Sequence, residues 1–404
     1  MAGTSSPSVV KGAYWPSWVS DFPPSSIDTS LFTHLYYAFL VPDNKTFELD
    51  VSDSASTLMR SFTSTIRSKN LPVKTLLAIG GWSAGGKVFS EMAKEEETRK
   101  SFINSCVRVA REYDFDGIDL DWEFPQDSQD MTNLGQLLEE LRAQVTKEEQ
   151  ETGNTKLYLT AAMAPTVDIN SHPDIPRSYP VNSINANLDW VNAMCYNYCG
   201  NWDTTKTGAH AAWSNPNGMS TRFALKSWID AGVRPGKLVM GLPLYGYSWK
   251  LKDPRSNGIG AAAVGVGPGD NGIMTYSEVE RFNGENKNAK FVNDEETVSA
   301  YSCAGIGGLD TMMSGQRRRR YSLLKALAFV GTSFGKSPAT AGGQSQVQLQ
   351  GRGLEYHFLA HIIGSNDIRT VLLPPGDWKP IENASIVTDD IMTHDNDLMV
   401  LTYG

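Results

Sequence analysis

Short apolar runs alternate with longer amphipathic segments over roughly the first 250 residues of the chain. The runs are rich in the β-branched and aromatic residues typical of buried strands, and they cover residues 10–15, 32–40, 73–82, 115–122, 157–165, 188–196 and 237–247. The segments between them place apolar residues at helical spacing; in 97–113, for example, Phe102, Cys106 and Val109 fall on one face. We therefore predict strands that alternate with helices at residues 56–69, 97–113, 131–150 and 221–232.

This alternation predicts the fold class. Strands separated by helices are parallel and joined by crossovers, and seven of them favour a closed eight-fold barrel over an open sheet. We predict an α/β protein whose residues 8–249 form a (β/α)8 TIM barrel. Residues 250–305 are rich in Gly, Asn and Lys and contain short strand-like pieces, which indicates a small α+β insertion domain. The eighth strand should lie beyond residue 310.

One strand carries acidic residues inside an apolar run, FDGIDLDWEFP at 115–125. Side chains alternate between the two faces of a strand, so Asp119, Asp121 and Glu123 share one face and the apolar residues between them share the other. The apolar face packs against helices, so the acids must face the barrel axis, with Glu123 at the C-terminal rim where barrel active sites are built. Carboxylates on one face stand about 6.5–7 Å apart and raise one another's pKa values. This pattern favours a general acid that stays protonated near neutral pH.

Two other interpretations of these acids remain open. Acids in a solvated loop would not alternate with Ile, Leu and Trp. A divalent-cation site is possible, but it lacks ligands from elsewhere in the sequence. Cys195 and Cys199 are four residues apart, which could be metal spacing, although no histidine or further cysteine lies nearby. We predict that the protein holds no metal and no cofactor.

Composition narrows the choice of partner. The chain of 404 residues has 36 basic and 45 acidic residues, a formal net charge of -9, which argues against nucleic acid or an anionic membrane and suits a neutral or polar substrate. Four cysteines are too few for a disulfide scaffold. No apolar run is long enough for a membrane span, and no signal peptide is visible at the N-terminus, MAGTSSPSVVKG.

The acidic segment also resembles a known family. DGIDLDWE, residues 116–123, matches the DxxDxDxE signature of family 18 glycoside hydrolases, and the resemblance extends from about Val10 to Gly305, most closely to plant class V chitinases. It implies a substrate-assisted, retaining hydrolysis of β-1,4-linked N-acetylglucosamine polymers, chitin or chitooligosaccharides, in which no second carboxylate acts as nucleophile. It assigns the general acid/base to Glu123 and the orientation of the substrate's N-acetyl group to Asp121. Asp119 would share a proton or hydrogen bond with Asp121, and Asp116 looks structural.

The resemblance extends to other strand ends. LAIGGW, residues 77–82, resembles the family's SxGG motif, with Ala78 where Ser is usual. Gly81 allows close approach of the backbone, and Trp82 offers a flat face to a sugar ring, although it could instead be a core residue. Tyr14 and Phe39 resemble residues of the pocket floor, with simple packing as an equal alternative.

Two methionines and a tyrosine complete the predicted pocket. We expect Met163 and Met194 to line it, although a methionine on a barrel strand is a core residue by default. MCYNYCG, residues 194–200, resembles the family's MxYDxxG, which implies that Tyr196 donates a hydrogen bond to the acetamido oxygen. Asn197 stands where Asp is usual. The amide can still bind the sugar, but it removes a negative charge near the cationic intermediate, so we expect impaired activity.

The resemblance stops after about residue 305. The family continues with WxGYDD and with an eighth strand ending GYFFW, and this sequence has neither. Residues 309–316 and 330–340 can be encoded by codons that, in a reading frame starting one nucleotide earlier, encode the family-like sequences GYDDVWS and GYFFWQV. We interpret residues 306–404 as a divergent, out-of-frame or disordered segment produced by a frameshift near Gly305, which sequencing of the transcript tests. The eighth strand would then be missing or disrupted, and the basic run Arg317–Arg320 is read neither as a nuclear signal nor as a binding patch.

The family resemblance implies a monomer in an extracellular or vacuolar location. Two alternatives to a chitinase remain open. One is a catalytically impaired, lectin-like protein of the same fold that binds chitooligosaccharides, since Asn197 and the missing floor tryptophan both weaken turnover. The other is a damaged gene product without function.

Overall fold

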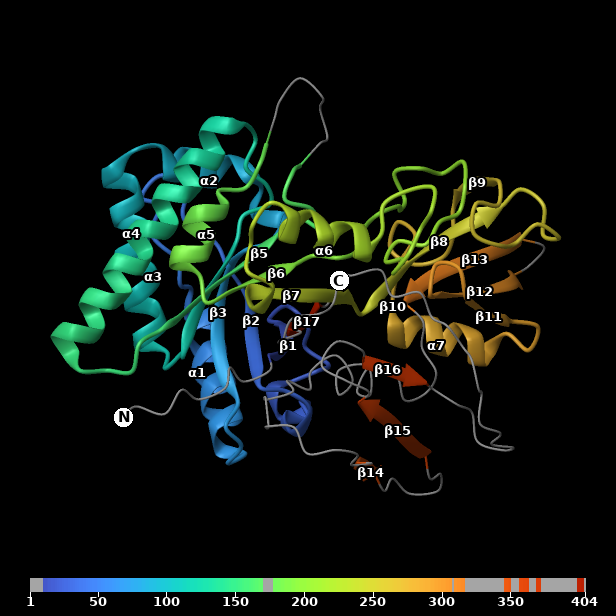
Figure 1. The fold of residues 1–404 in the computed structure, drawn as a ribbon, viewed down its shortest axis with the longest axis horizontal. Coiled ribbons are helices and arrows are strands. Elements are labelled where there is room, and N and C mark those ends of the chain that lie inside the picture. The colour runs from blue at the N-terminus through green and yellow to red at the C-terminus, as the bar shows by residue number, and fades with distance from the viewer. Residues whose placement is uncertain are drawn as a thin grey trace. The chain divides into compact units, whose positions relative to one another are not determined.

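The computed structural model describes residues 10–169, 177–306, 309–316, 345–349, 356–362, 368–371 and 398–402. Its main part is a closed barrel of parallel strands (Figure 1). Seven of these strands come from the first 243 residues: β1 (Lys11–Pro16), β2 (His34–Leu40), β3 (Lys74–Gly80), β4 (Gly117–Asp121), β5 (Tyr158–Met163), β6 (Trp190–Ala193) and β7 (Leu238–Pro243). All seven coincide with predicted apolar runs, which confirms the predicted barrel.

The strand order fixes which side chains meet in the barrel interior. Around the barrel the order is β1, β17, β7, β6, β5, β4, β3 and β2. β4 therefore lies between β3 and β5. In the register of these strands, Asp119 stands beside Ala78 on one side and Thr160 on the other.

The eighth position is occupied by β17 (Leu398–Thr402), which pairs in parallel with both β1 and β7. The family's own eighth strand, which the sequence predicts to be missing or disrupted, is therefore not what closes the barrel; β17 takes its position. The short apolar run LMVLT supplies backbone partners that β1 and β7 would otherwise lack as open edges. The strand comes from the far end of the chain, and residues 317–344, where the sequence comparison placed the family's own eighth strand, lie outside the described residues.

In the described ranges, six helices lie between the consecutive strands from β2 to β7: α1 (Asp53–Ser68), α2 (Gly86–Lys94), α3 (Glu96–Glu112), α4 (Ser128–Thr152), α5 (Val181–Asn187) and α6 (Thr221–Asp230). At the N-termini of α1, α4 and α6, a side chain satisfies a backbone N–H group that has no partner within the helix. Ser52 accepts from Ala55 N at the start of α1, and Asp127 accepts from Asp130 N at the start of α4. α4 ends at Gly153, whose positive φ of 71° suits a glycine.

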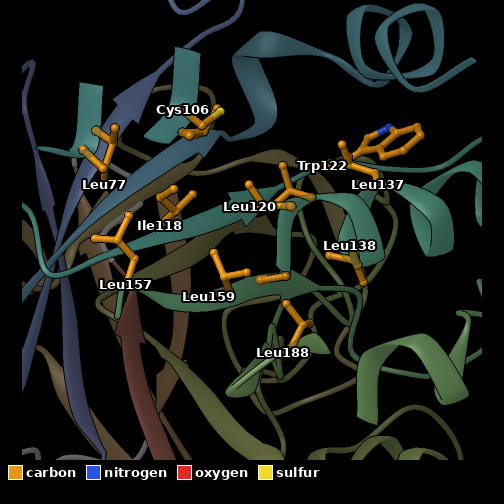
Figure 2. Packing of buried hydrophobic residues seen from close by; sticks show 14 of the residues in the cluster. Leu77, Cys106, Ile118, Leu120, Trp122, Leu137, Leu138, Leu157, Leu159 and Leu188 are labelled. Carbon is orange, nitrogen blue, oxygen red and sulfur yellow. The ribbon is translucent and has the colours of Figure 1, made fainter. Parts of the chain in front are cut away.

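The main apolar core lies between the strands and the helices. Ile118, Leu120 and Trp122 of the β4 segment belong to this core, as predicted from their alternation with the acids. Figure 2 shows Ile118 and Leu120 together with Leu137 and Leu138 of α4 in the same cluster. The packing of these apolar residues forces the acidic residues of the same strand to the other side of the sheet, into the barrel.

The predicted insertion is confirmed as a small α+β element after β7. It contains β8 (Tyr245–Leu251), β9 (Ala263–Val266), β10 (Ile273–Thr275), α7 (Tyr276–Glu285), β11 (Lys290–Asp294), β12 (Ser299–Ile306) and β13 (Leu309–Gln316). Its antiparallel sheet has the order β10, β8, β13, β12 and β11, with β9 paired to β8. Because β13 pairs with both β12 and β8, the sheet extends beyond residue 305.

A second compact unit includes residues 334–395. Its described residues form a three-stranded antiparallel sheet of β14 (Ser345–Leu349), β15 (Tyr356–Ile362) and β16 (Ile368–Val371). Among the helices in the described ranges, none combines the length and apolar character that a membrane crossing requires.

Candidate active site

Three carboxyl groups follow one another along the inner side of β4 and its C-terminal end. Asp119 is completely buried and Asp121 is nearly so. Glu123 comes two residues after the end of β4 and is partly exposed. The row therefore runs from the closed interior of the barrel toward the open rim.

Asp119 is held by hydrogen bonds from three other strands. The Tyr14 hydroxyl of β1 donates to Oδ2 at 2.7 Å. The Thr160 hydroxyl of β5 and the Asn192 amide of β6 donate to Oδ1 at 2.5 and 3.1 Å. Burial raises the pKa of Asp119 to about 6, and the three donors oppose that rise because they stabilise the charged carboxylate.

Asp121 has a different environment. Its Oδ1 atom is buried and has no hydrogen-bond partner within the described part of the chain. Burial, and then the charges of Glu123 and Asp119, raise the pKa of Asp121 well above its ordinary value. The shared proton or hydrogen bond between Asp119 and Asp121 stays a prediction; Asp119 accepts from its three donors, and its charge acts on Asp121. Burial also raises the pKa of Glu123 to about 7.

Two glycines let neighbouring backbones approach the acids. Gly80 has a φ of 118°, and a Cβ atom on it would lie 2.0 Å from the carbonyl oxygen of Asp121. Gly81 has a φ of 79°, and its Cβ would lie 2.8 Å from the ring of Phe39. The Gly81 N–H donates to the Asp121 carbonyl at 2.9 Å. A larger residue at Gly80 would clash with the backbone of the acid-bearing strand, and one at Gly81 would clash with the Phe39 ring.

The predicted aromatic residues gather at the same barrel end. The Tyr14 ring stacks on Tyr36 with centroids 4.4 Å apart and lies 6.3 Å from the Phe39 ring. Phe39 in turn stacks on Trp18, which is largely exposed. Trp82 directly follows Gly81 and is 77% exposed, so it is not a core residue and its ring is open to a ligand.

The two methionines separate into different environments. Met194 packs with Tyr196, Ala162 and Tyr245 in one apolar cluster. The structure differs from the expectation for Met163, which lies in the main core between strands and helices. The reason is its place in β5, where it shares a face with Leu159 and Ala161 rather than with the inward-facing Thr160.

Asn197 follows Tyr196 and is fixed by two tyrosines of the insertion. Its Oδ1 accepts from the Tyr245 hydroxyl at 2.6 Å and from the Tyr247 hydroxyl at 3.2 Å. Its φ of 59° is one that Asn tolerates better than most residues. Tyr196 lies against Tyr245, with ring centroids 6.1 Å apart in an edge-to-face arrangement. The insertion therefore contributes side chains to the rim of the candidate site.

Asp116, the first acid of the motif, stands apart from the row. It forms an ion pair with Lys74 Nζ at 3.1 Å and accepts a hydrogen bond from Thr75 N at 2.9 Å, at the start of β3 and β4. These contacts agree with the structural role expected for it.

Sequence reasoning missed three residues near the acids. Thr160 and Asn192 donate to Asp119, and both are polar residues at inward positions of otherwise apolar strands, a signal that could have identified them. The third, Tyr179, accepts from Ala164 N at 3.1 Å; burial raises its pKa, and the charges of Glu123 and Asp121 add to that rise. Tyr179 follows an irregular segment, and nothing in its local sequence pattern marks it.

No group of three or more His, Cys, Asp or Glu side chains in the described ranges could hold a metal ion. Cys195 is buried and Cys199 is partly buried, and both are free thiols. Burial raises the pKa of each of these thiols to about 12, which disfavours the thiolate that metals bind.

Comparison with known proteins identifies the family. The sequence model of the Glycosyl hydrolases family 18 matches residues 11–314. The chain belongs to glycosyl hydrolase family 18. The class V chitinase CHIT5b of Medicago truncatula is 46% identical over 297 residues, which are 73% of this chain and 77% of the relative. The part of this chain that family 18 accounts for thus ends in β13.

Solved structures of similar proteins share the fold. A mutant of the class V chitinase from Nicotiana tobaccum, solved in complex with NAG4, has a TM-score of 0.71 and 38% identity, covering 76% of this chain and 87% of that one. The chitinase-like agglutinin RobpsCRA from Robinia pseudoacacia has a TM-score of 0.67 and 35% identity, covering 76% and 88%. The solved proteins with this fold therefore include one named as a chitinase and one named as a chitinase-like agglutinin.

Proposed function

We propose that this family 18 protein is a chitinase that cleaves β-1,4-linked N-acetylglucosamine polymers with retention of configuration. The observation that carries the proposal is the row of Asp119, Asp121 and Glu123, which runs from the buried interior to the rim with all three pKa values raised. A carboxyl whose pKa lies near neutrality can both donate and accept a proton at the pH of a living cell. The similarity to class V chitinases supports the choice of substrate.

The proposed reaction has two steps. Glu123 donates its proton to the glycosidic oxygen, the leaving sugar departs, and the carbonyl oxygen of the substrate's own N-acetyl group bonds to the anomeric carbon. Asp121 orients that acetamido group, and Tyr196 donates a hydrogen bond to its oxygen. Glu123, now ionised, then takes a proton from a water molecule. The water oxygen attacks the anomeric carbon and breaks its bond to the N-acetyl oxygen, which restores the acetamido group. Two inversions at this carbon leave its configuration unchanged.

A second candidate function is binding without turnover. Asn197 supplies no negative charge beside the cationic intermediate, and the chain is also similar to a chitinase-like agglutinin. The two functions are separated by incubating the full chain with a chitin tetramer, measuring released reducing ends, and measuring affinity by calorimetry. Turnover supports the chitinase, whereas micromolar binding without released sugar supports the lectin-like protein. If the chain neither hydrolyses nor binds the tetramer, both proposals are contradicted.

The pH dependence of hydrolysis should follow the acid row. Glu123 must be protonated to act as an acid, so kcat/KM should fall as the pH rises through about 7. It should also fall as the pH drops below about 6, because Asp119 then becomes neutral and the row loses its negative charge. Initial rates from pH 4 to 9 measure both the acid limb of the kcat/KM profile, below about pH 6, and its alkaline limb, above about pH 7. A rate that stays constant between pH 7 and 9 would contradict the role of Glu123.

Restoring the family's usual residue at position 197 should increase activity. In Asn197→Asp the carboxylate can still accept from Tyr245 and Tyr247, and it adds a negative charge near the positively charged intermediate. We expect kcat to rise about tenfold, which corresponds to about 1.4 kcal/mol of transition-state stabilisation. Asn201→Asp, a nearby Asn-to-Asp change outside the motif, is the control. An unchanged or lower kcat in Asn197→Asp would show that the amide is not what limits the rate.

A further inference from the structure

The two strands beside Asp119 differ in what they offer its carboxylate. On β3 the neighbour in register is Ala78, which has no hydrogen-bonding group. On β5 it is Thr160, whose hydroxyl lies 2.5 Å from Asp119 Oδ1. Thr160 is itself buried, with 2% of its surface exposed, so its hydroxyl does not exchange this bond for water. The support for Asp119 is therefore one-sided within the sheet.

We propose that Thr160 is a positioning residue that keeps Asp119 charged and oriented beside Asp121, in place of the hydroxyl that the SxGG-like segment lacks at Ala78. The inference rests on the proposed function, because it assigns a catalytic consequence to the charge on Asp119. Thr160 does not touch the reacting atoms; it acts through Asp119.

The physical need for this donor follows from the burial of Asp119. A carboxylate removed from water is stable only when donors replace its hydration. Of the other two donors, Tyr14 binds Oδ2, and the Asn192 amide divides its hydrogens between Asp119 at 3.1 Å and the Tyr14 hydroxyl at 2.9 Å. Thr160 is therefore the closest donor to Oδ1, and its loss leaves that oxygen with one longer bond.

The charge on Asp119 matters because of the groups that face it. The titratable side chains around it are Tyr14 of β1, Tyr36 of β2, and Asp121 and Glu123 of its own segment. The neighbouring β3, β5 and β6 present Ala78, Thr160 and Asn192, none of which carries a charge. Burial, the charge of Glu123 and the charge of Asp119 together raise the pKa of Asp121, and a neutral Asp119 would remove its own part of that effect.

The test compares Thr160→Val with Thr160→Ser. Valine has nearly the volume of threonine but no hydroxyl, whereas serine keeps the hydroxyl. In Thr160→Val the acid limb of the kcat/KM profile should move up by about one pH unit, because a hydrogen bond to a charged group has been lost. KM should change less than kcat, and Thr160→Ser should keep the wild-type profile. Adding Ala78→Ser to Thr160→Val supplies a hydroxyl from the other neighbouring strand and should move the acid limb back.

A second readout does not depend on activity. The folded-state pKa of Asp119 lies above its unfolded value, so its contribution to stability is complete below about pH 4 and is lost as the pH rises through about 6. Thr160→Val raises this pKa further, so its loss of unfolding free energy relative to Thr160→Ser should be small at pH 4 and larger at pH 8. If hydrolysis is absent in every variant the proposed function fails, and the unfolding data still decide the role of Thr160. The proposed role of Thr160 would be overturned if Thr160→Val and Thr160→Ser had the same pH profile of kcat/KM and differed in unfolding free energy by the same amount at pH 4 and pH 8.

Discussion

The Glu123→Gln variant is expected to hydrolyse chitooligosaccharides about 10²–10⁴-fold more slowly than the wild type, because glutamine cannot donate the proton that the leaving oxygen requires. Its affinity for the tetramer should be unchanged or higher. The amide has nearly the same shape as the protonated carboxyl, and burial already raises the pKa of Glu123 to about 7, so a neutral side chain suits this position. Release of reducing ends and calorimetric titration, made on the same preparations, measure the two quantities.

The matched control is Glu139→Gln. Glu139 is exposed on α4, so the same chemical change there should alter neither rate nor affinity. Equal rates of sugar release by wild type and Glu123→Gln would remove Glu123 from the mechanism. A parallel loss of affinity and of melting temperature would mean that the change had damaged the fold.

The barrel and its acid row could be predicted because both depend on local patterns. The alternation in FDGIDLDWE assigns Ile118 and Leu120 to the helix side, and this leaves only the interior for Asp119 and Asp121. The same rule of alternation would have shown that Met163 faces the core, since Thr160 of the same strand faces inward.

Other features depend on contacts between distant segments, which no local pattern contains. Thr160 becomes important only because β4 and β5 pair in a register that places it beside Asp119. The closing strand β17 has four apolar residues and a threonine near the end of the chain, and its role follows from the open edges of β1 and β7 rather than from its own sequence. The hydrogen bonds that Tyr245 and Tyr247 donate to Asn197 likewise form only because the insertion packs against the barrel rim.

The Asp121→Asn variant is expected to become more stable while it loses activity. Asp121 is buried, one of its oxygens has no partner in the described part of the chain, and two other acids flank it. An amide is neutral without taking up a proton, so folding no longer carries the cost of protonating a buried carboxyl, and the free energy of unfolding should increase by about 1–3 kcal/mol at pH 7.5. Hydrolysis should fall about 100-fold, because the acetamido group loses the carboxyl that orients it.

The pH dependence gives this prediction its sign. Because the folded-state pKa of Asp121 lies above its unfolded value, wild-type Asp121 stabilises the fold fully only below about pH 4, and this stabilisation is lost as the pH rises. The gain in Asp121→Asn should therefore be largest at pH 7.5 and disappear near pH 4, as measured by denaturant unfolding at both pH values. Asp116→Asn provides the opposite case, since Asp116 is paired with Lys74 at 3.1 Å and its neutralisation should destabilise the protein at pH 7.5. If Asp121→Asn were also less stable at pH 7.5, the carboxyl would be part of the structural framework, and the buried row would not be an arrangement that sacrifices stability for catalysis.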